Sequence, residues 1–227
     1  MKIKKQFLQL SVFSTFLLFT ACGGNSQQKT SEQNPLNNEN EPMNMQDQNK
    51  STTDMHKKHF GLANNFTHKD IVVLEHKYKL DKSSKSEMKQ VINSYLQINK
   101  ALFIDDENAT NLAIALMTEK VGAVTAKDFK GEGLVAWGNH KTLYLSKLKE
   151  MLHIKGLDNK RSYFSHISEI MYCTIKSFEL DTSELYAVYC PMAFDNNGAY
   201  WISNTKNIMN PYFGAEMPKC GEIKEEL

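Results

Sequence analysis

The sequence predicts a mainly α-helical fold: an antiparallel four-helix bundle with a small C-terminal β-rich cap. Apolar side chains recur at steps of three and four residues in four separate stretches between residues 85 and 178, which is the period of helices with one buried face. Only short connections separate these stretches, and this favours antiparallel neighbours. After residue 181 the pattern changes to short alternating runs separated by turn residues, which indicates strands.

The four helices are placed by their apolar stripes and their end signals. Residues 84–87 have the spacing of a capping box, so we expect them to open the first helix. The second helix is expected from about residue 108, the third over residues 137–153, and the fourth from about residue 159. Gly156 is a natural stop between the last two helices.

The cap is predicted from the sequence after the fourth helix. The runs ELYAVYCPM and AYWIS alternate like strands, AFDNNGA between them is typical of a turn, and CGEIKEEL can form one more strand. A segment of about 45 residues is too small to have a core of its own. We therefore expect the cap to pack on the bundle.

The N-terminus has the features of an export signal. Residues 1–21 combine three lysines with an apolar run over residues 7–19, which is typical of a signal peptide and too short to span a membrane. The sequence FTAC is similar to a bacterial lipobox, which implies cleavage before Cys22 and lipidation of its thiol. We therefore expect a bacterial envelope lipoprotein anchored through Cys22. Gly23, in place of an aspartate after the cysteine, resembles the pattern of lipoproteins sorted to the outer membrane, so we expect the protein there, facing the periplasm. An ordinary secreted protein cut nearby is the alternative.

Three parts are predicted after the signal peptide. Residues 22–69 are predicted to form a flexible tether, residues 70–84 an extended segment, and residues 85–227 the helical bundle with its cap. Residues 23–54 contain no aromatic residue and only three large apolar ones. Such a stretch cannot bury enough surface to offset its conformational entropy.

Charge and motifs exclude two classes of function. The formal net charge of the 227 residues is +1, and nucleic-acid binding needs a concentrated basic face. The sequence has no glycine-rich phosphate loop, no H-E-x-x-H and no G-x-S-x-G. We therefore predict no nucleic-acid partner and no enzymatic activity.

Four sulfur-bearing residues in the cap are the candidate site. Cys190 and Met192 share one face if they lie on a strand, and Met217 and Cys220 are three apart, so one turn can present both. Thiolates and thioethers select Cu(I) and related soft ions over hard ones. If the two pairs face each other, they form a soft-metal site.

Each of these features also has a plainer interpretation. Cys190 and Cys220 could form a disulfide that closes a loop of about 30 residues, and the two methionines could fill the core. Trp201 could cover a bound cation with its ring or be a packing residue. His166 could lend a nitrogen ligand from the bundle or be a hydrogen-bonded helix residue. The sequence alone does not decide between a metal site and a disulfide.

A resemblance to a known family adds a functional context. The segments YCPMAFDNNGAYWISN (189–204) and MNPYFGAEMPKCGEI (209–223) are similar to the C-terminal signature of the DUF3347 family, a family named for its unknown function. LDNKRSYFSHIS (157–168) resembles the segment before its last helix, and the whole resemblance covers roughly residues 87–225. Members stand alone as lipoproteins or secreted proteins and occur fused to periplasmic adaptors of heavy-metal efflux systems. The resemblance implies handling of copper or silver, with efflux components as partners.

The expected function is non-catalytic binding of a soft metal, with Cu(I) as the expected ion. The protein would act as a chaperone, a buffer or an accessory to heavy-metal efflux, and its ligands would be Cys190, Met192, Met217 and Cys220. The alternative is a structural or protein-interaction module of the envelope, with a Cys190–Cys220 disulfide and no metal. In that version the aromatic pair of NPYFG would face a protein partner.

Overall fold

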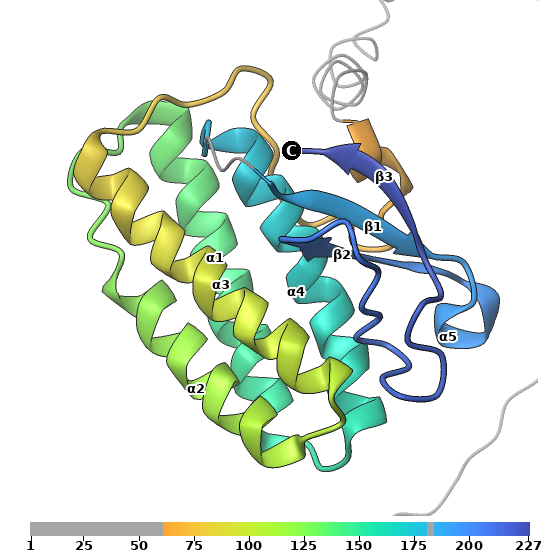
Figure 1. The fold of residues 1–227 in the computed structure, drawn as a ribbon. Helices are drawn as coiled ribbons and strands as arrows, with labels where there is room; N and C mark the ends of the chain where they lie inside the picture. Colours follow the sequence, from red (N-terminus) through yellow and green to blue (C-terminus); the bar gives the residue numbers. More distant parts are fainter. Residues whose placement is uncertain (1–60, 181–183) are drawn as a thin grey trace, which may run out of the picture. The chain divides into compact units, whose positions relative to one another are not determined.

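The computed structural model describes residues 61–180 and 184–227 (Figure 1). The predicted signal peptide, the lipidation at Cys22 and the tether up to residue 60 lie outside the described residues. The described residues belong to one structural unit of the chain. Within these described residues, no helix is both long enough and apolar enough to be a candidate membrane span.

Four long helices form the larger part of the fold and confirm the predicted fold class. They are α1 (Lys82–Phe103), α2 (Glu107–Ala123), α3 (Gly131–His153) and α4 (Leu157–Ser177). Helices that follow each other in the chain pack against each other, and α1 also meets α4, as Figure 1 shows. The apolar stripes predicted from the sequence face the common interior.

The first helix begins before the expected capping box. Asp81 is its N-cap, and its Oδ1 accepts a hydrogen bond from the backbone N–H of Ser84 at 2.5 Å. Glu87 does not reach back to the start of the helix. Its Oε2 accepts from the backbone N–H of Thr125 at 2.9 Å. Glu87, the acidic residue of the predicted capping box, therefore joins α1 to the segment just after α2.

The third helix also begins earlier than the sequence pattern indicates. It opens at Gly131, in a stretch where the apolar period is broken. Gly133 in its first turn leaves room for the ring of Tyr78, with which a Cβ at this position would collide. The absence of a side chain lets the segment before α1 pack directly on the first turn of α3.

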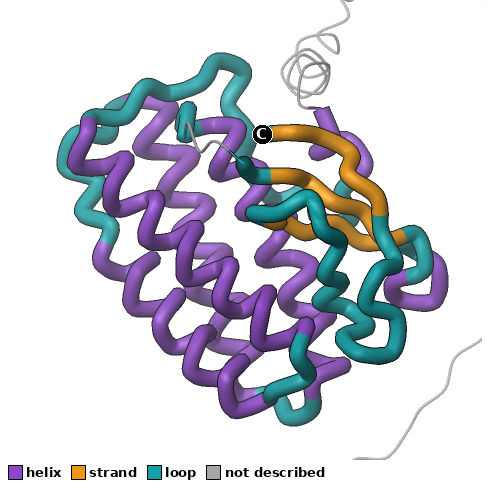
Figure 2. Tube along the Cα trace, in the orientation of Figure 1, coloured by secondary structure: helices purple, strands orange, loops and turns teal. Residues whose placement is uncertain are grey.

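The cap contains the three predicted strands in an antiparallel sheet of order β2-β1-β3 (Figure 2). They are β1 (Tyr186–Cys190), β2 (Ala199–Ser203) and β3 (Glu222–Glu226). The predicted turn between β1 and β2 is formed by α5 (Ala193–Asn196), a single tight turn in which Phe194 and Asp195 have positive φ and not the φ of a right-handed helix.

The sheet packs on the bundle through β2 and α4. Side chains of α1 complete the hydrogen bonds of β2, which lies at the edge of the sheet. The hydroxyl of Tyr95 accepts from the backbone N–H of Ile202 at 3.0 Å, and Nδ2 of Asn99 donates to the carbonyl of Ile202 at 2.9 Å. This edge is therefore closed by the bundle and not left for another strand.

The segment before α1 is more ordered than the predicted tether. Residues 61–80, which we call the N-terminal strap, begin with a 3-10 helix, η2 (Gly61–Asn65). Phe66 is 3% exposed and packs against the rings of Tyr172 and Tyr200. The prediction that the tether extends to residue 69 is therefore wrong for residues 61–69, because Phe66 docks them on the domain.

The second half of the strap is extended but contains no strand. Its backbone bonds to side chains of the helices: the N–H of Val72 donates to Oδ1 of Asn139 at 3.0 Å, and the carbonyl of Val72 lies 2.6 Å from Nε2 of His140. These bonds replace the strand pairing that the alternating sequence of this segment suggests.

Candidate functional site: the cysteine pair of the cap

Two cysteines from separate segments meet in the cap. The Sγ atoms of Cys190 and Cys220, which are 30 positions apart in the chain, lie 2.6 Å from each other. Cys190 is the last residue of β1, and Cys220 comes just before β3, which pairs with β1 through Tyr189 and Glu222. Antiparallel pairing of these two strands brings the thiols together, which is the condition that both the metal site and the disulfide require.

Asn210 fixes the loop that carries Cys220. It is fully buried, and its Nδ2 donates to the carbonyl of Cys220 at 2.7 Å. Its Oδ1 accepts from the backbone N–H of Tyr212 at 2.7 Å, and its own N–H donates to the carbonyl of Pro218 at 3.0 Å. One amide side chain therefore holds both ends of the loop over residues 210–220.

Trp201 lies beneath the same loop as a packing residue. Strand register pairs it with Val188, so it shares a face of the sheet with Cys190. The indole is fully buried and meets the ring of Tyr212 edge-on, with centroids 5.9 Å apart. A Cβ on Gly221, whose φ is +151°, would lie 2.6 Å from Cη2 of Trp201. The backbone next to Cys220 therefore rests directly on the indole.

The two methionines approach the pair through their backbones. The backbone N–H of Met192 hydrogen-bonds to the sulfur of Cys220, and the carbonyl of Met217 accepts from the N–H of Cys220 at 3.2 Å. Met192 is 47% exposed, whereas Met217 is half-buried. The structure therefore places both residues beside Cys220, with the Met192 side chain directed largely to solvent.

The environment of Cys220 favours its protonated form. Burial raises the pKa of the Cys220 thiol to about 11, and the neighbouring Cys190 thiol adds to this rise. The hydrogen bond from the backbone N–H of Met192 acts in the opposite direction. Because thiolates are the metal-binding and nucleophilic form, binding of a metal ion here would release protons.

An ion-pair network ties the loop of the cap to the end of the bundle. Arg161 is 7% exposed, and its Nε donates to the carbonyl of Pro211 at 3.0 Å. Its guanidinium also pairs with Asp158 at 2.8 Å and with Asp105. Oδ2 of Asp105 accepts from the backbone N–H of Ala215 at 2.9 Å. The bundle therefore holds the segment that leads to Cys220.

Sequence reasoning missed this role of Arg161, although the sequence contains a signal for it. Arg161 lies three residues before Phe164, so it is on the apolar stripe of α4. A charged residue on a buried stripe needs a partner. Asp105 looks like an ordinary acidic residue at a helix start, so its contact with Ala215 is visible only in the fold.

His166 belongs to a different cluster from the cysteine pair. Its ring stacks on that of His68 in the strap, with centroids 3.4 Å apart, and its Nε2 lies 3.5 Å from Oδ1 of Asp70. Glu169 accepts from the backbone N–H of both Thr67 and His68. These contacts hold the strap on α4, and they do not support His166 as an accessory ligand of the cysteine pair.

The donor set of the cap fits a soft ion better than a hard one. Among residues 61–180 and 184–227, no three His, Cys, Asp or Glu side chains gather so that they could hold a metal ion. The cysteine pair therefore offers two thiolates, and a further ligand would have to come from Met192 or Met217. Two thiolates with a thioether suit Cu(I) and Ag(I).

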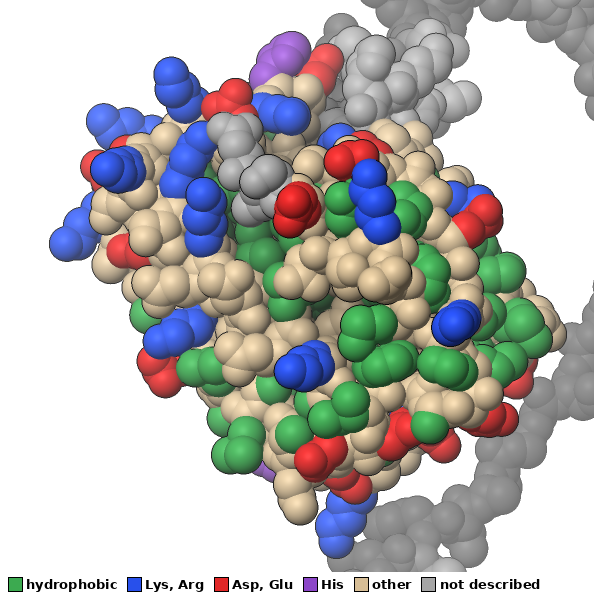
Figure 3. Space-filling view, in the orientation of Figure 1, with side chains coloured by type: hydrophobic (Ala, Val, Ile, Leu, Met, Phe, Trp, Pro, Cys, Tyr) green, Lys and Arg blue, Asp and Glu red, His purple; other side chains and the backbone are tan. Residues whose placement is uncertain are grey.

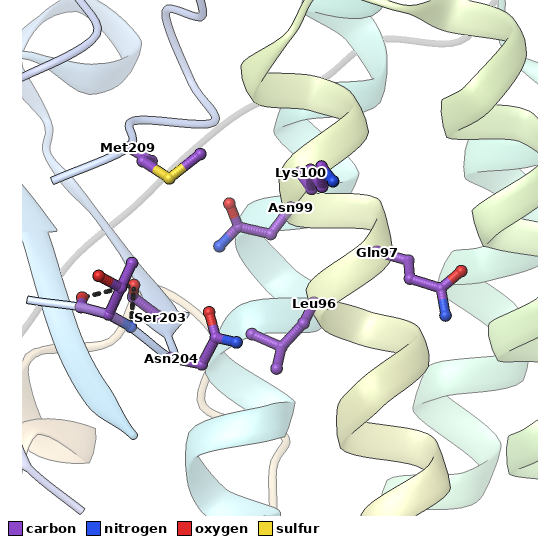
Figure 4. Close-up of a pocket in the computed structure, with 8 residues that line it drawn as sticks. Leu96, Gln97, Asn99, Lys100, Ser203, Asn204 and Met209 are labelled. Atoms are coloured by element: carbon purple, nitrogen blue, oxygen red, sulfur yellow. Dashed lines mark hydrogen bonds between the residues drawn. The ribbon is translucent and has the colours of Figure 1, made fainter. Parts of the chain in front are cut away.

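A cavity of about 290 Å³ lies between α1 and the chain after β2 (Figure 4). Asn99 points across it toward the sheet, whereas Gln97 points away. Its polar groups are largely used by the fold, because the Asn99 amide bonds to Ile202 and the Ser203 hydroxyl bonds to Thr205. The cavity is lined by Leu96, Gln97, Asn99, Lys100, Ser203, Asn204, Thr205 and Met209. The cysteine pair is therefore the stronger candidate site.

Comparison with known families confirms the resemblance over the helical part of the chain. Residues 91–183 match the model of the family described as "Protein of unknown function (DUF3347)". This match covers most of α1 and all of α2, α3 and α4, and it ends before β1, so the cysteine pair lies outside it. Searches of curated proteins and of solved structures gave no match.

Proposed function

We propose that this protein binds a soft monovalent metal ion, Cu(I) or Ag(I), at the dithiol formed by Cys190 and Cys220. It would act without catalysis as a chaperone, buffer or accessory to heavy-metal efflux, anchored in the cell envelope through Cys22. The observation that supports the proposal is that two sulfur atoms from distant parts of the chain meet. Their separation of 2.6 Å is shorter than two free thiols or two metal-bound thiolates adopt and is closer to that of a disulfide, so metal binding requires the pair to be reduced and to open. Thiolates are the ligands that soft ions prefer.

Metal uptake would require a small movement of one cysteine. Metal–thiolate bonds are about 2.3 Å long, so two thiolates on one ion lie roughly 3.8–4.6 Å apart. Cys190 is held in a buried strand, whereas Cys220 lies on a loop and is half-buried. We therefore expect Cys220 to move outward, toward the exposed side chain of Met192, which could then supply a thioether.

The test is a Cu(I) titration of the reduced protein in competition with a chromogenic Cu(I) chelator. Replacing Cys22 with Ser throughout removes the lipidation thiol, so that only the cap and Cys173 contribute thiols. We expect one tightly bound ion per chain, and loss of it in both Cys190→Ser and Cys220→Ser. Cys173→Ala is the matched control, because Cys173 is buried in the bundle, and it should bind normally. Absence of binding with all thiols reduced would end the proposal.

If the two thiols are oxidised, the contact between Cys190 and Cys220 instead favours a structural or partner-binding function. A Cys190–Cys220 disulfide would lock the cap and stabilise it by roughly 3–4 kcal/mol in the chain-entropy model, and the protein would be a structural or partner-binding module. The NPYFG aromatics do not both face a partner, because Tyr212 is 6% exposed and packs in the cap. Mass measurement after alkylation, with and without reductant, separates the two functions: a metal-free disulfide in protein recovered from the envelope favours the second.

A further inference from the structure

The two sulfur atoms of the cap differ in their access to solvent. Cys190 is 0% exposed at the end of a strand paired on both sides by the sheet. Cys220 is half-buried on the loop outside the strands, and it is followed by Gly221, which carries no side chain. A thiol reagent that approaches from solvent therefore reaches the sulfur of Cys220 first.

The surroundings of Cys220 suit an approaching protein thiol. Met192 and Ile223, each within three residues of a cysteine, are exposed apolar side chains with 47% and 39% exposure. Figure 3 shows hydrophobic side chains on this face interspersed with charged ones, and in β3 the exposed Glu222 and Lys224 lie on either side of Ile223. A partner would therefore meet a mixed surface in which Met192 and Ile223 offer apolar contacts close to the cysteine pair.

We propose that the cap is switched between dithiol and disulfide by thiol–disulfide exchange at Cys220, with a dithiol oxidoreductase as the partner. This inference rests on the proposed function, because only the reduced pair offers two thiolates to a soft ion. Oxidation would therefore remove the metal site, and reduction would restore it.

Reduction of the cap proceeds in two balanced steps. A thiolate of the partner attacks Sγ of Cys220, a bond between the partner and Cys220 forms, and the bond between Cys220 and Cys190 breaks. The electron pair goes to the sulfur of Cys190, which takes up a proton. The second thiolate of the partner then attacks the partner's own sulfur and releases Cys220, which is protonated in turn. The partner loses two electrons, and the cap gains them.

The fold favours attack of the partner's thiolate at Cys220 over attack at Cys190. Attack at Cys190 would require a thiol to enter between the strands, beside the buried indole of Trp201. The backbone of the loop around Cys220 is held by Asn210 and by the Arg161 network, so the cysteine stays at the surface of the cap. Exchange is therefore expected to be selective for one of the two sulfurs.

Reduced glutathione provides the probe for this selectivity, because its thiolate attacks the disulfide as the partner thiolate would. In the oxidised Cys22→Ser protein, it should form the mixed disulfide at Cys220 at least tenfold faster than at Cys190. Intact mass and peptide mapping give the rate and the position. Equal rates, or faster modification of Cys190, would overturn the proposal.

A second measurement starts from the reduced cap. Brief alkylation of the reduced protein, followed by peptide mapping, should label Cys220 before Cys190, and simultaneous labelling would contradict the proposal. Both experiments are done without metal, so their outcome is independent of Cu(I) affinity. Failure of the metal titration with selective exchange intact would remove the metal function and leave the redox-active pair.

Discussion

The bundle and the cap are stabilised in different ways. The bundle buries large apolar side chains on several helices, among them Trp137, Phe164 and Phe178, which have at most 2% exposure. The cap has three strands of five residues each and a long loop, and its geometry depends on a few polar anchors, above all Asn210 and Arg161. Bulk burial therefore determines the scaffold, whereas individual hydrogen bonds determine the position of the candidate site.

The largest effect is expected in the bundle. Trp137→Ala removes a buried indole that meets the rings of Phe129 and Phe178 and should lower the free energy of unfolding by about 3–5 kcal/mol. Leu112→Ala, at a side chain that is 73% exposed on α2, is the control and should change it little. Denaturant unfolding followed by circular dichroism measures both. A small effect of Trp137→Ala would mean that the bundle is not held by this core.

The second largest effect is expected from a substitution that breaks the contacts between the bundle and the cap. Arg161→Met keeps the apolar stem but removes the bonds to Pro211 and Asp105, so we expect a loss of about 2–3 kcal/mol and faster alkylation of Cys220. Lys147→Met breaks the partly exposed pair with Glu150, and it should cost less than about 1 kcal/mol. If alkylation of Cys220 is unchanged in Arg161→Met, the bundle does not position the loop.

Acidification should weaken the docking of the strap. Burial, followed by the proximity of His68, lowers the pKa of His166 to about 4 in the folded protein, below the value of about 6.5 for the unfolded chain. Protonation therefore favours unfolding: the stability is complete above pH 6.5 and is lost as the pH falls toward 4, by at most about 1.4 kcal/mol per pH unit.

The groups that face this ring are the strap residues His68 and Asp70, Glu169 on α4, and Lys147 and Glu150 on α3. Asp70 and Glu169 oppose part of the effect, because they favour the protonated imidazole. Urea unfolding between pH 7 and pH 4.5 measures the slope, with His166→Gln as the variant in which this contribution should vanish. An identical slope in the variant would assign the acid sensitivity to other groups.

The smallest loss of stability is expected from Asn210→Ala, and its consequences should be confined to the loop that carries Cys220. Asn210→Ala leaves the carbonyl of Cys220 and the N–H of Tyr212 without their partner, at a cost of about 1–3 kcal/mol. The loop should loosen, so we expect weaker Cu(I) binding and less selective alkylation, while the helical signal is retained. Asn207→Ala, at an exposed position just before this loop, should behave like the parent protein. Unchanged Cu(I) binding in Asn210→Ala would show that the amide does not organise the site.

The same contrast determines how much the sequence could predict. Helices and strands follow from apolar periodicity, so the four helices, the three strands and the attachment of the cap to the bundle could be predicted from the sequence. The start of α1 could not be fixed, because Asp81 and Ser84 are both good N-caps and Glu87 bonds to distant Thr125. The boundary of the strap was missed because Phe66 becomes buried only through rings more than 100 positions away.

The candidate site could be predicted only in part, because it lies partly on strands and partly on an irregular loop. The meeting of Cys190 and Cys220 follows from the pairing of β1 with β3, whereas the sequence offered it only as a condition of the metal site or the disulfide. The exposure of Met192 and the burial of Asn210 depend on the path of an irregular loop, which has no period to read from the sequence. His166 was assigned to the wrong neighbourhood because its partners lie in the strap.

X-ray absorption at the copper edge of the Cu(I)-loaded Cys22→Ser protein tests the central claim most directly. If Cys190 and Cys220 hold the ion, the nearest shell contains at least two sulfur atoms at about 2.3 Å, and this shell disappears in the Cys190→Ser/Cys220→Ser double variant. A first shell of nitrogen or oxygen atoms, or a sulfur shell that persists in the double variant, would contradict the claim.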